Sequence, residues 1–342
     1  MAELFGRSWS RRELLERVGD VAQLAGVRAA VLGDGRAAGV GMLEVYTSGL
    51  TFQILSGRAL DIGACSFRGL PLQWTSPVGE VHPAYYEPAG KGWLRSFPGG
   101  LLTTCGLDHF GAASVAGGED RGLHGRASNL PAERVAWRGR WLGDEYEIEV
   151  TGRVRQARLF GENLTLERRL VTRLGASWLR VEDTVSNEGF REQPHMLLYH
   201  CNLGFPLVQA GAELHLDSRE TVAVDAKAEA GLGIWSQVDE PAAGYSEQVF
   251  RHRPLVQADG SAVARLLSPR SKLALDLRFS AESLPYLYQW KMLGQGEYVL
   301  GLEPANCPGL AGSAAAQARG DVPLLAPGEQ RSYSLTFELE EA

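Results

Sequence analysis

The sequence predicts an all-β protein, built as one large antiparallel β-sandwich with a helix at its N-terminus. Three segments alternate apolar and polar residues with a period of two: 146–154, 178–185 and 332–339. Such alternation is typical of antiparallel strands that have one buried and one solvated face. Clusters of turn-forming residues separate such runs, at 33–35, 186–189, 258–260 and 326–328. Only one segment has helical periodicity, which favours a sandwich over an α/β fold.

The predicted helix lies near the N-terminus. Ser10 and Glu13 have the spacing of a capping box, in which each side chain satisfies a backbone N–H at the start of a helix. An apolar stripe at helical spacing follows (Leu14, Val18, Val21 and Leu24). We therefore expect a helix over residues 10–24, within an N-terminal attachment of residues 1–36. A single β-sandwich domain is expected over 37–342, with the Ala- and Gly-rich segment 311–320 as a surface loop.

Composition and charge exclude several classes of protein. The chain has 342 residues, 44% of them hydrophobic, and a net charge of −7. That length is ample for a large core, and the scattered basic residues do not form the positive patch that a nucleic-acid partner requires. No apolar run approaches the ~18 residues of a membrane-spanning helix. Residues 1–17 mix acidic and basic side chains, so no secretory leader is expected.

The four cysteines indicate a reducing environment. Cys65, Cys105, Cys201 and Cys307 are far apart, and no two of them form a CxxC pair. Their neighbours are mostly small or apolar, so we expect buried free thiols and a cytoplasmic location.

Familiar cofactor and metal motifs are missing from the sequence. There is no GxGxxG that opens a helix after a strand, no phosphate-binding P-loop and no HExxH. His195 and His200 are five residues apart, and on an extended strand they point to opposite faces. We therefore expect neither a cofactor nor a metal ion.

Two segments place polar side chains where hydroxyl groups could be bound. His124 and Arg126 flank a glycine, and both can donate hydrogen bonds, although an ordinary turn with two solvated side chains explains them equally. His200 and Asn202 share one face of a strongly apolar strand. They are either hydrogen-bonded core residues or a proton donor and its neighbour at a cavity, since His titrates near neutral pH.

A third segment brings a carboxylate out of the core. Glu303 ends a largely apolar strand and precedes a proline, so it is either paired in a salt bridge or functional. Upstream, Gln289 and Trp290 offer an aromatic face beside a polar group. That arrangement suits the C–H face of a sugar ring, but Trp290 could equally be a core residue.

In this order, the segments resemble those of the galactose mutarotase-like superfamily, the aldose 1-epimerases. "HCNLGF" at His200 is similar to the strand "NHSYFNL", and "LEPANCPGL" at Glu303 is similar to "EPQ…PD". "LHGRASNLP" at His124 resembles the upstream "HG" element. "PGGLLTTCGLDHFG" from Pro98 resembles "RGGIPVCWPWFG" of the hexose-6-phosphate epimerases. The resemblance covers roughly residues 40 to 340.

The resemblance implies a fold and a reaction. The fold is a large twisted β-sandwich with a sugar bound in its concave face. His200 would be the general acid and Glu303 the general base of sugar ring opening, without a cofactor, and His124 would contact the sugar. The partner would be a monosaccharide or a sugar derivative, and a homodimer is one option. We expect His124 and four further polar candidates to hold sugar hydroxyls (Arg126, Asn202, Gln289 and Asn306), with Trp290 as the aromatic platform for the sugar ring.

Several positions depart from the family pattern. Pro98 stands where the phosphate-sugar epimerases have an arginine, which disfavours a phosphorylated substrate. No segment matches the family motif that carries the hydroxyl-binding Asp. Asp239 is a candidate for that role, but its neighbours do not match the motif. Four polar residues are not found in this form in the familiar mutarotases (Arg58, Asp61, Asp108 and His109). Two alternatives therefore stay open: a non-catalytic sugar-binding or sensor protein, and an isomerase or lyase that uses these four residues on an acidic sugar.

Overall fold

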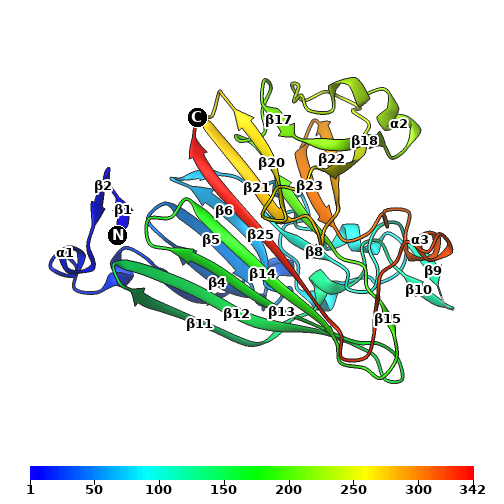
Figure 1. Ribbon diagram of the computed structural model, residues 1–342, viewed down its shortest axis with the longest axis horizontal. Coiled ribbons are helices and arrows are strands. Elements are labelled where there is room, and N and C mark those ends of the chain that lie inside the picture. Colours follow the sequence, from blue (N-terminus) through cyan, green and yellow to red (C-terminus); the bar gives the residue numbers. More distant parts are fainter. Residues whose placement is uncertain (117) are drawn as a thin grey trace.

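Three antiparallel sheets form the body of the molecule. The computed structural model describes residues 1–116 and 118–342. The largest sheet has eight strands, which run diagonally across the view of Figure 1. In spatial order they are β11 (Ala132–Leu142), β12 (Glu145–Ala157), β13 (Asn163–Arg173), β14 (Trp178–Asn187), β25 (Gln330–Glu341), β21 (Leu273–Ser280), β20 (Ser261–Ser268) and β17 (Glu213–Leu216).

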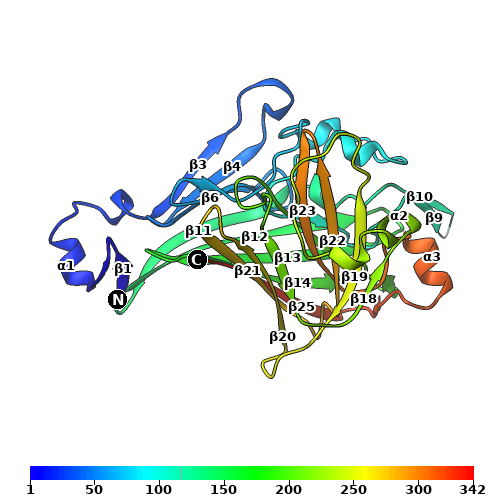
Figure 2. The same ribbon diagram turned by 90° about the horizontal axis from the view of Figure 1, so that it is seen from above.

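Two smaller sheets pack against this large sheet. The six-stranded sheet has the order β18 (Ser218–Ala223), β19 (Gln248–Pro254), β22 (Tyr286–Gly294), β23 (Glu297–Ala305), β16 (Leu198–Leu203) and β8 (Thr103–Cys105). The five-stranded sheet has the order β3 (Gly26–Val31), β4 (Gly41–Tyr46), β5 (Leu50–Leu55), β6 (Asp61–Phe67) and β7 (Leu70–Pro71). In the view of Figure 2, strands β3 and β4 of this last sheet can be seen apart from the strands of the large sheet.

Short elements complete the chain. Three two-stranded ladders are β1 (Ala2–Leu4) with β2 (Arg7–Trp9), β9 (Ser114–Ala116) with β10 (Glu119–Arg121), and β15 (Gln193–Pro194) with β24 (Leu324–Leu325). The α-helices are α1 (Arg11–Leu15), α2 (Ala226–Glu229) and α3 (Ser313–Ala318). Helices α1 and α3 lie at opposite ends of the molecule (Figures 1 and 2). In the described part of the chain, no helix has the length and apolar character needed to cross a membrane.

The predicted strands are confirmed, and so is the all-β class. The three alternating segments lie in β12, β14 and β25, which are neighbours or near neighbours in the large sheet. In β25 the apolar members of the alternation are buried, from Tyr333 to Leu339 at every second position. They pack with residues of both smaller sheets, such as Phe52 of β5 and Leu302 of β23, in one continuous core. The apolar residues that alternate with a period of two therefore lie on the face of each strand that contacts this core. All four cysteines are buried and free, also as predicted.

Two local predictions were wrong. The capping box at Ser10 and Glu13 is present, but helix α1 ends at Leu15 instead of continuing to residue 24. The Asp20 carboxylate accepts a hydrogen bond from the Ala22 N–H and so starts a separate 3₁₀ turn, Val21–Gln23. This local cap competes with continuation of the helix. The segment 311–320 contains the short helix α3, and its Ala316 is buried against the molecule.

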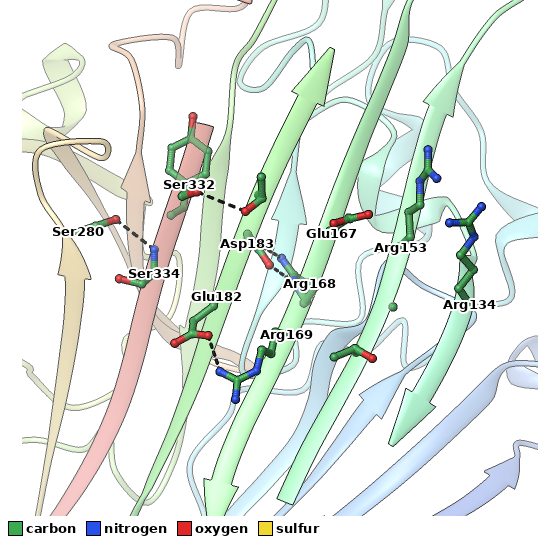
Figure 3. Close-up of a pocket in the computed structure, with 14 residues that line it drawn as sticks. Arg134, Arg153, Glu167, Arg168, Arg169, Glu182, Asp183, Ser280, Ser332 and Ser334 are labelled. Atoms are coloured by element: carbon green, nitrogen blue, oxygen red, sulfur yellow. Dashed lines mark hydrogen bonds and ion pairs between the residues drawn. The ribbon is translucent and has the colours of Figure 1, made fainter. Parts of the chain in front are cut away.

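A buried arginine joins the three sheets. Arg168 on β13 makes a bidentate ion pair with Asp183 on β14, at 2.9 and 2.7 Å. Its remaining N–H groups reach Asp61 of β6 at 3.2 Å and the Thr104 hydroxyl of β8 at 3.0 Å. Tyr199 of β16 donates to the same Asp183 carboxylate at 2.7 Å. Figure 3 shows Arg168 and Asp183 side by side on adjacent strands. The guanidinium therefore holds residues of all three sheets around one charge.

We predict that Arg168→Met destabilises the protein by about 3–5 kcal/mol, because it leaves buried carboxylates without their cation. The matched control is Arg169→Met, one residue along the same strand. Arg169 is partly exposed, and it pairs with the partly exposed Glu182 and with Glu149, which keeps Arg138 as a second partner, so its loss is expected to cost about 1 kcal/mol or less. Urea unfolding of both variants measures the difference, and equal losses would contradict the role assigned to Arg168.

Candidate functional site

A cavity of about 650 Å³ opens on one face of the six-stranded sheet. Strands β16, β19, β22 and β23 contribute side chains to it, and two long connections form the opposite wall. The first connection joins β7 to β8 and supplies residues between 74 and 97. The second supplies Gly111, Ala112, Leu123 and His124. Of the twelve site residues predicted from the sequence, the cavity wall contains four (His124, His200, Trp290 and Glu303).

His200 and Glu303 lie beside each other on adjacent strands. Cys201 of β16 pairs with Leu302 of β23, and this register brings the two functional side chains to the same level. The Nε2 atom of His200 is 3.2 Å from the Oε1 atom of Glu303. Both side chains line the cavity, yet only 5% of His200 and 2% of Glu303 is exposed. The two groups therefore form a close pair at the buried end of the cavity.

A glycine in the same strand makes room for this pair. Gly301 lies two residues before Glu303, on the same face of β23. A Cβ atom at position 301 would lie 2.8 Å from the Oε1 atom of Glu303 and 3.0 Å from the Cβ atom of Trp290. Any larger residue would push these side chains apart. Gly301 is thus a site residue that the analysis missed, and a glycine inside a strand pattern is the signal that could have found it.

Burial favours the neutral form of both members of the pair. Burial, together with the nearby Glu247 carboxylate, raises the pKa of Glu303 to about 8. Burial lowers the pKa of His200 to about 4. Moving an ionised carboxylate or imidazolium out of water is costly, so each group prefers to be uncharged here. Between these two values the pair carries one proton, and these pKa values place it on Glu303.

Three polar atoms of residues that line the cavity lack hydrogen-bond partners among the described residues. They are the Oε1 atom of Glu303, the Nδ1 atom of His200 and the Nδ1 atom of His124. The centroids of the His124 and His200 rings are 5.6 Å apart. Burial, together with the nearby His200, lowers the pKa of His124 well below its ordinary value. Each buried polar atom left unpaired costs ~1–3 kcal/mol. A ligand that can both donate and accept hydrogen bonds would satisfy them.

Aromatic side chains surround His200. Phe97 lies 5.1 Å and Trp290 5.5 Å from its ring, and Trp93 stacks on Phe97 at 4.3 Å. Trp74 lies edge-on to Trp290, with ring centroids 5.9 Å apart. Trp74, Trp93 and Phe97 were not among the site residues predicted from the sequence. All three belong to the long connection between β7 and β8, and such loops without periodicity often carry function.

Charged residues occur at the exposed end of the cavity. Glu247, Glu297 and Lys91 line it and are exposed. The Glu247 carboxylate accepts a hydrogen bond from the indole N–H of Trp290 at 3.0 Å, which holds the ring in place. These three residues lie in loops or at a strand end, and nothing in their local sequence distinguishes them from ordinary surface charges.

Three predicted sugar ligands are engaged with the backbone instead. The Asn202 amide donates to the carbonyls of Gly100 and His200, both at 3.0 Å. The Asn306 side chain bridges the Leu197 N–H and a carbonyl before β16. The Gln289 amide donates to the carbonyl of Trp235 and meets a buried histidine on its other side. None of the three lines the cavity, because buried amides first satisfy nearby backbone groups.

Arg58, Asp61 and Arg126 also lie away from the cavity wall. Arg58 is buried and donates to the Val81 carbonyl at 2.7 Å. Asp61 belongs to the ion-pair network of the core described above. The guanidinium of Arg126 lies 3.7 Å from the Glu119 carboxylate, close to the surface. The sequence alone could not distinguish these structural pairings from ligand contacts.

Asp108 and His109 complete the set of predicted residues. Asp108 accepts hydrogen bonds from Arg121 at 3.0 Å and from Gln156 at 2.6 Å. The Nδ1 atom of His109 accepts from the Ser313 N–H at 3.2 Å, at the start of helix α3. Asp108 thus joins its loop to β10 and β12, and His109 joins the same loop to helix α3. Within the described residues, no group of three or more His, Cys, Asp or Glu side chains could hold a metal ion.

A second hollow, of about 660 Å³, lies on the large sheet (Figure 3). Two of its arginines pair with acidic residues of the neighbouring strand, Arg168 with Asp183 and Arg169 with Glu182 at 2.6 Å. Arg153 is paired with Glu188 just outside the hollow. Tyr333 is the one aromatic residue among the described residues that line it, and none of the twelve residues predicted for the site does so. The cavity around His200 and Glu303 is therefore the candidate site.

Comparisons with known proteins agree with this architecture. A family model described as "Domain of unknown function (DUF4432)" matches residues 37–339. No curated protein matches the chain at a significant level. Among solved structures, a candidate aldose 1-epimerase from Klebsiella pneumoniae is similar over 93% of this chain and 86% of its own, at 25% identity and a TM-score of 0.86.

More distant structures share the fold. A galactose mutarotase-like protein from Clostridium acetobutylicum is 12% identical, covers 94% of this chain and 100% of its own, and has a TM-score of 0.66. A galactose 1-epimerase from Lactobacillus acidophilus is 14% identical over 93% of this chain and 99% of its own, with a TM-score of 0.58. The chain thus has the fold of galactose mutarotase-like proteins, as predicted from the sequence, and it belongs to the DUF4432 family.

Proposed function

We propose that this protein is an aldose 1-epimerase-like enzyme that interconverts the two anomers of a sugar. One observation carries the proposal: His200 and Glu303 are a buried pair, 3.2 Å apart, at the end of an aromatic-lined cavity. The structural likeness to proteins assigned as aldose 1-epimerases supports it. The substrate is a reducing monosaccharide or a derivative of one.

The reaction requires two proton transfers, one from the anomeric hydroxyl and one to the neighbouring ring oxygen. The anomeric hydroxyl loses its proton to a base while the ring oxygen gains one from an acid. The bond between C1 and the ring oxygen breaks, and the aldehyde forms. Rotation about C1–C2 and closure with the roles reversed give the other anomer. Positioned acids and bases of this kind contribute about 10²–10⁴-fold in rate.

The pair has the proton count that these transfers need. The expectation from the resemblance was an ionised Glu303 beside a charged His200, whereas burial favours a protonated Glu303 beside a neutral His200. Both forms contain one proton. Each half-reaction converts one form into the other, because one group gives a proton as the other receives one. The neutral form is thus the resting state, and either direction of ring opening uses the same two residues.

The structure weighs against the two alternatives unequally. An acidic sugar calls for cationic groups that converge on its carboxylate. Lys91 is the one cationic side chain among the described residues of the cavity wall, and the four unusual residues lie elsewhere. A sensor that only binds sugar does not need a buried acid–base pair with unpartnered atoms. The experiment below separates it from an enzyme.

We predict that Glu303→Gln and His200→Ala each reduce anomer exchange by about 10²–10⁴-fold, because each removes one proton carrier. Proton NMR exchange spectroscopy on neutral and acidic sugars, with catalytic amounts of protein, measures the rate above that of buffer alone.

The chain contains a matched control for this test. His215 and Glu213 on β17 form an exposed pair with atoms 4.0 Å apart, so His215→Ala and Glu213→Gln are expected to keep the wild-type rate. Sugar binding without faster exchange in the wild-type protein would instead establish the sensor function.

We predict a bell-shaped dependence of kcat/KM on pH, with limbs near pH 4 and pH 8. As pH falls through about 4, His200 takes up a second proton and the pair loses its base. As pH rises through about 8, Glu303 ionises and the pair loses its acid. Since kcat/KM reports groups of the free enzyme, the limbs should match these values. A flat profile from pH 4 to 9 would contradict the assignment.

Stability should report the protonated carboxyl independently of activity. Below pH 4.5, the ordinary pKa, Glu303 is protonated in both folded and unfolded chains. As pH rises to about 8, the unfolded chain ionises first, so folding loses free energy. We therefore predict that at pH 8 the free energy of unfolding of Glu303→Gln exceeds that of wild type by about 2–4 kcal/mol, as measured by urea unfolding. The two proteins should be nearly equal at pH 4, and the opposite order would show that Glu303 is ionised when folded.

A further inference from the structure

The cavity has two levels that differ in exposure and in chemistry. At the inner level lie the buried pair and the buried rings of Trp93 and Phe97. At the outer level, nearer to solvent, lie Trp74 and Trp290, which are partly exposed. The inner level contains all three unpartnered nitrogen and oxygen atoms of the site. The proposed reaction accounts for the inner level alone.

The outer level is an aromatic corner. The rings of Trp74 and Trp290 meet at 80° with their centroids 5.9 Å apart, so they form a floor and a wall. The position of each ring is fixed. The Glu247 carboxylate accepts a hydrogen bond from the indole N–H of Trp290. The backbone N–H of Trp74 donates a hydrogen bond to the Asn202 carbonyl, and the Trp74 carbonyl accepts one from the Gly100 N–H. A corner that is held rigid while still exposed to solvent is suited to bind a ligand, because little order has to be imposed on binding.

Polar side chains border this corner on its solvent side. Glu247, Glu297 and Lys91 line the cavity and are exposed. They provide both hydrogen-bond acceptors and donors beside the apolar faces of the rings. A sugar ring has the complementary surface: a face of C–H groups and an edge of hydroxyls.

The size of the cavity fits more than one ring. Its volume of about 650 Å³ lies within the range that encloses drug-sized ligands. One sugar ring at His200 and Glu303 would also contact Trp290, whose ring lies 5.5 Å from that of His200. The partly exposed ring of Trp74, at the solvent side of Trp290, would then be left for a second sugar ring.

We propose that the outer level is a second sugar subsite, and that the preferred substrate is a reducing disaccharide or longer saccharide. Its reducing-end ring lies at His200 and Glu303, and the next ring stacks in the corner of Trp74 and Trp290. The assignment of the reducing end rests on the function proposed above. The stacking of the second ring rests on the corner itself.

The test compares disaccharides with the monosaccharide of their reducing end. The probes are cellobiose, maltose and lactose against glucose, and 4-O-β-galactobiose against galactose. We expect kcat/KM for anomer exchange to be about three- to tenfold higher for at least one disaccharide, the gain typical of one added aromatic contact. In Trp74→Ala this ratio should fall to about one, and in Trp74→Phe most of it should return. Trp137→Ala, at an exposed tryptophan of β11 outside the cavity, should keep the wild-type ratio.

Dissociation constants from calorimetry, measured on the same proteins and sugars, separate this inference from the proposed function. Tighter binding of a disaccharide that depends on Trp74, without anomer exchange, would support the subsite and refute the epimerase. Anomer exchange with no disaccharide preferred over its monosaccharide would support the epimerase and overturn the subsite. A disaccharide preference that survives in Trp74→Ala would also overturn it.

Discussion

The charge of Arg168 is the interaction on which the three-sheet arrangement depends. Five strands from three sheets meet at this guanidinium, through Asp183, Asp61, Thr104 and Tyr199. Because a buried guanidinium must fill its N–H positions, the strands are fixed in distance and also in direction. Tyr199 directly precedes His200 in the chain, and Thr104 is the residue of β8 that pairs with Tyr199. The contacts of Arg168 in the core therefore help to fix the position of His200, in addition to the pairing of its own strand.

The same low-polarity interior decides the chemistry of the pair. In water His200 and Glu303 would differ by about two pKa units, with the carboxyl the stronger acid. Burial reverses this order, since it lowers the pKa of the imidazole and raises that of the carboxyl. The reversal places the proton of the resting pair on Glu303 and leaves His200 neutral at neutral pH.

Sequence periodicity predicted what depends on one face of a strand. The alternation in β12, β14 and β25 and the apolar setting of His200 and Glu303 are properties of single strands, and the structure confirms the strands. Which polar residue reaches the cavity depends on neighbouring strands and loops. Asn202 shares a strand face with His200, yet its amide is occupied by the carbonyls of Gly100 and His200. The aromatic wall comes from a connection without periodicity, so Trp74, Trp93 and Phe97 had no pattern to mark them.

The reacting pair owes its spacing to a sheet ladder, whereas the cavity mouth is made by connections. The register of β16 with β23 sets the distance between His200 and Glu303, independently of any loop. Trp74, Lys91 and Glu247 instead belong to segments that join strands, and Lys91 and Glu247 are exposed. Under the proposed function, selectivity and proton transfer thus depend on different residues of this molecule. Protein engineers could exchange exposed residues such as Lys91 and Glu247 to change which saccharides bind, while keeping the buried Trp93 and Phe97 in place beside the pair.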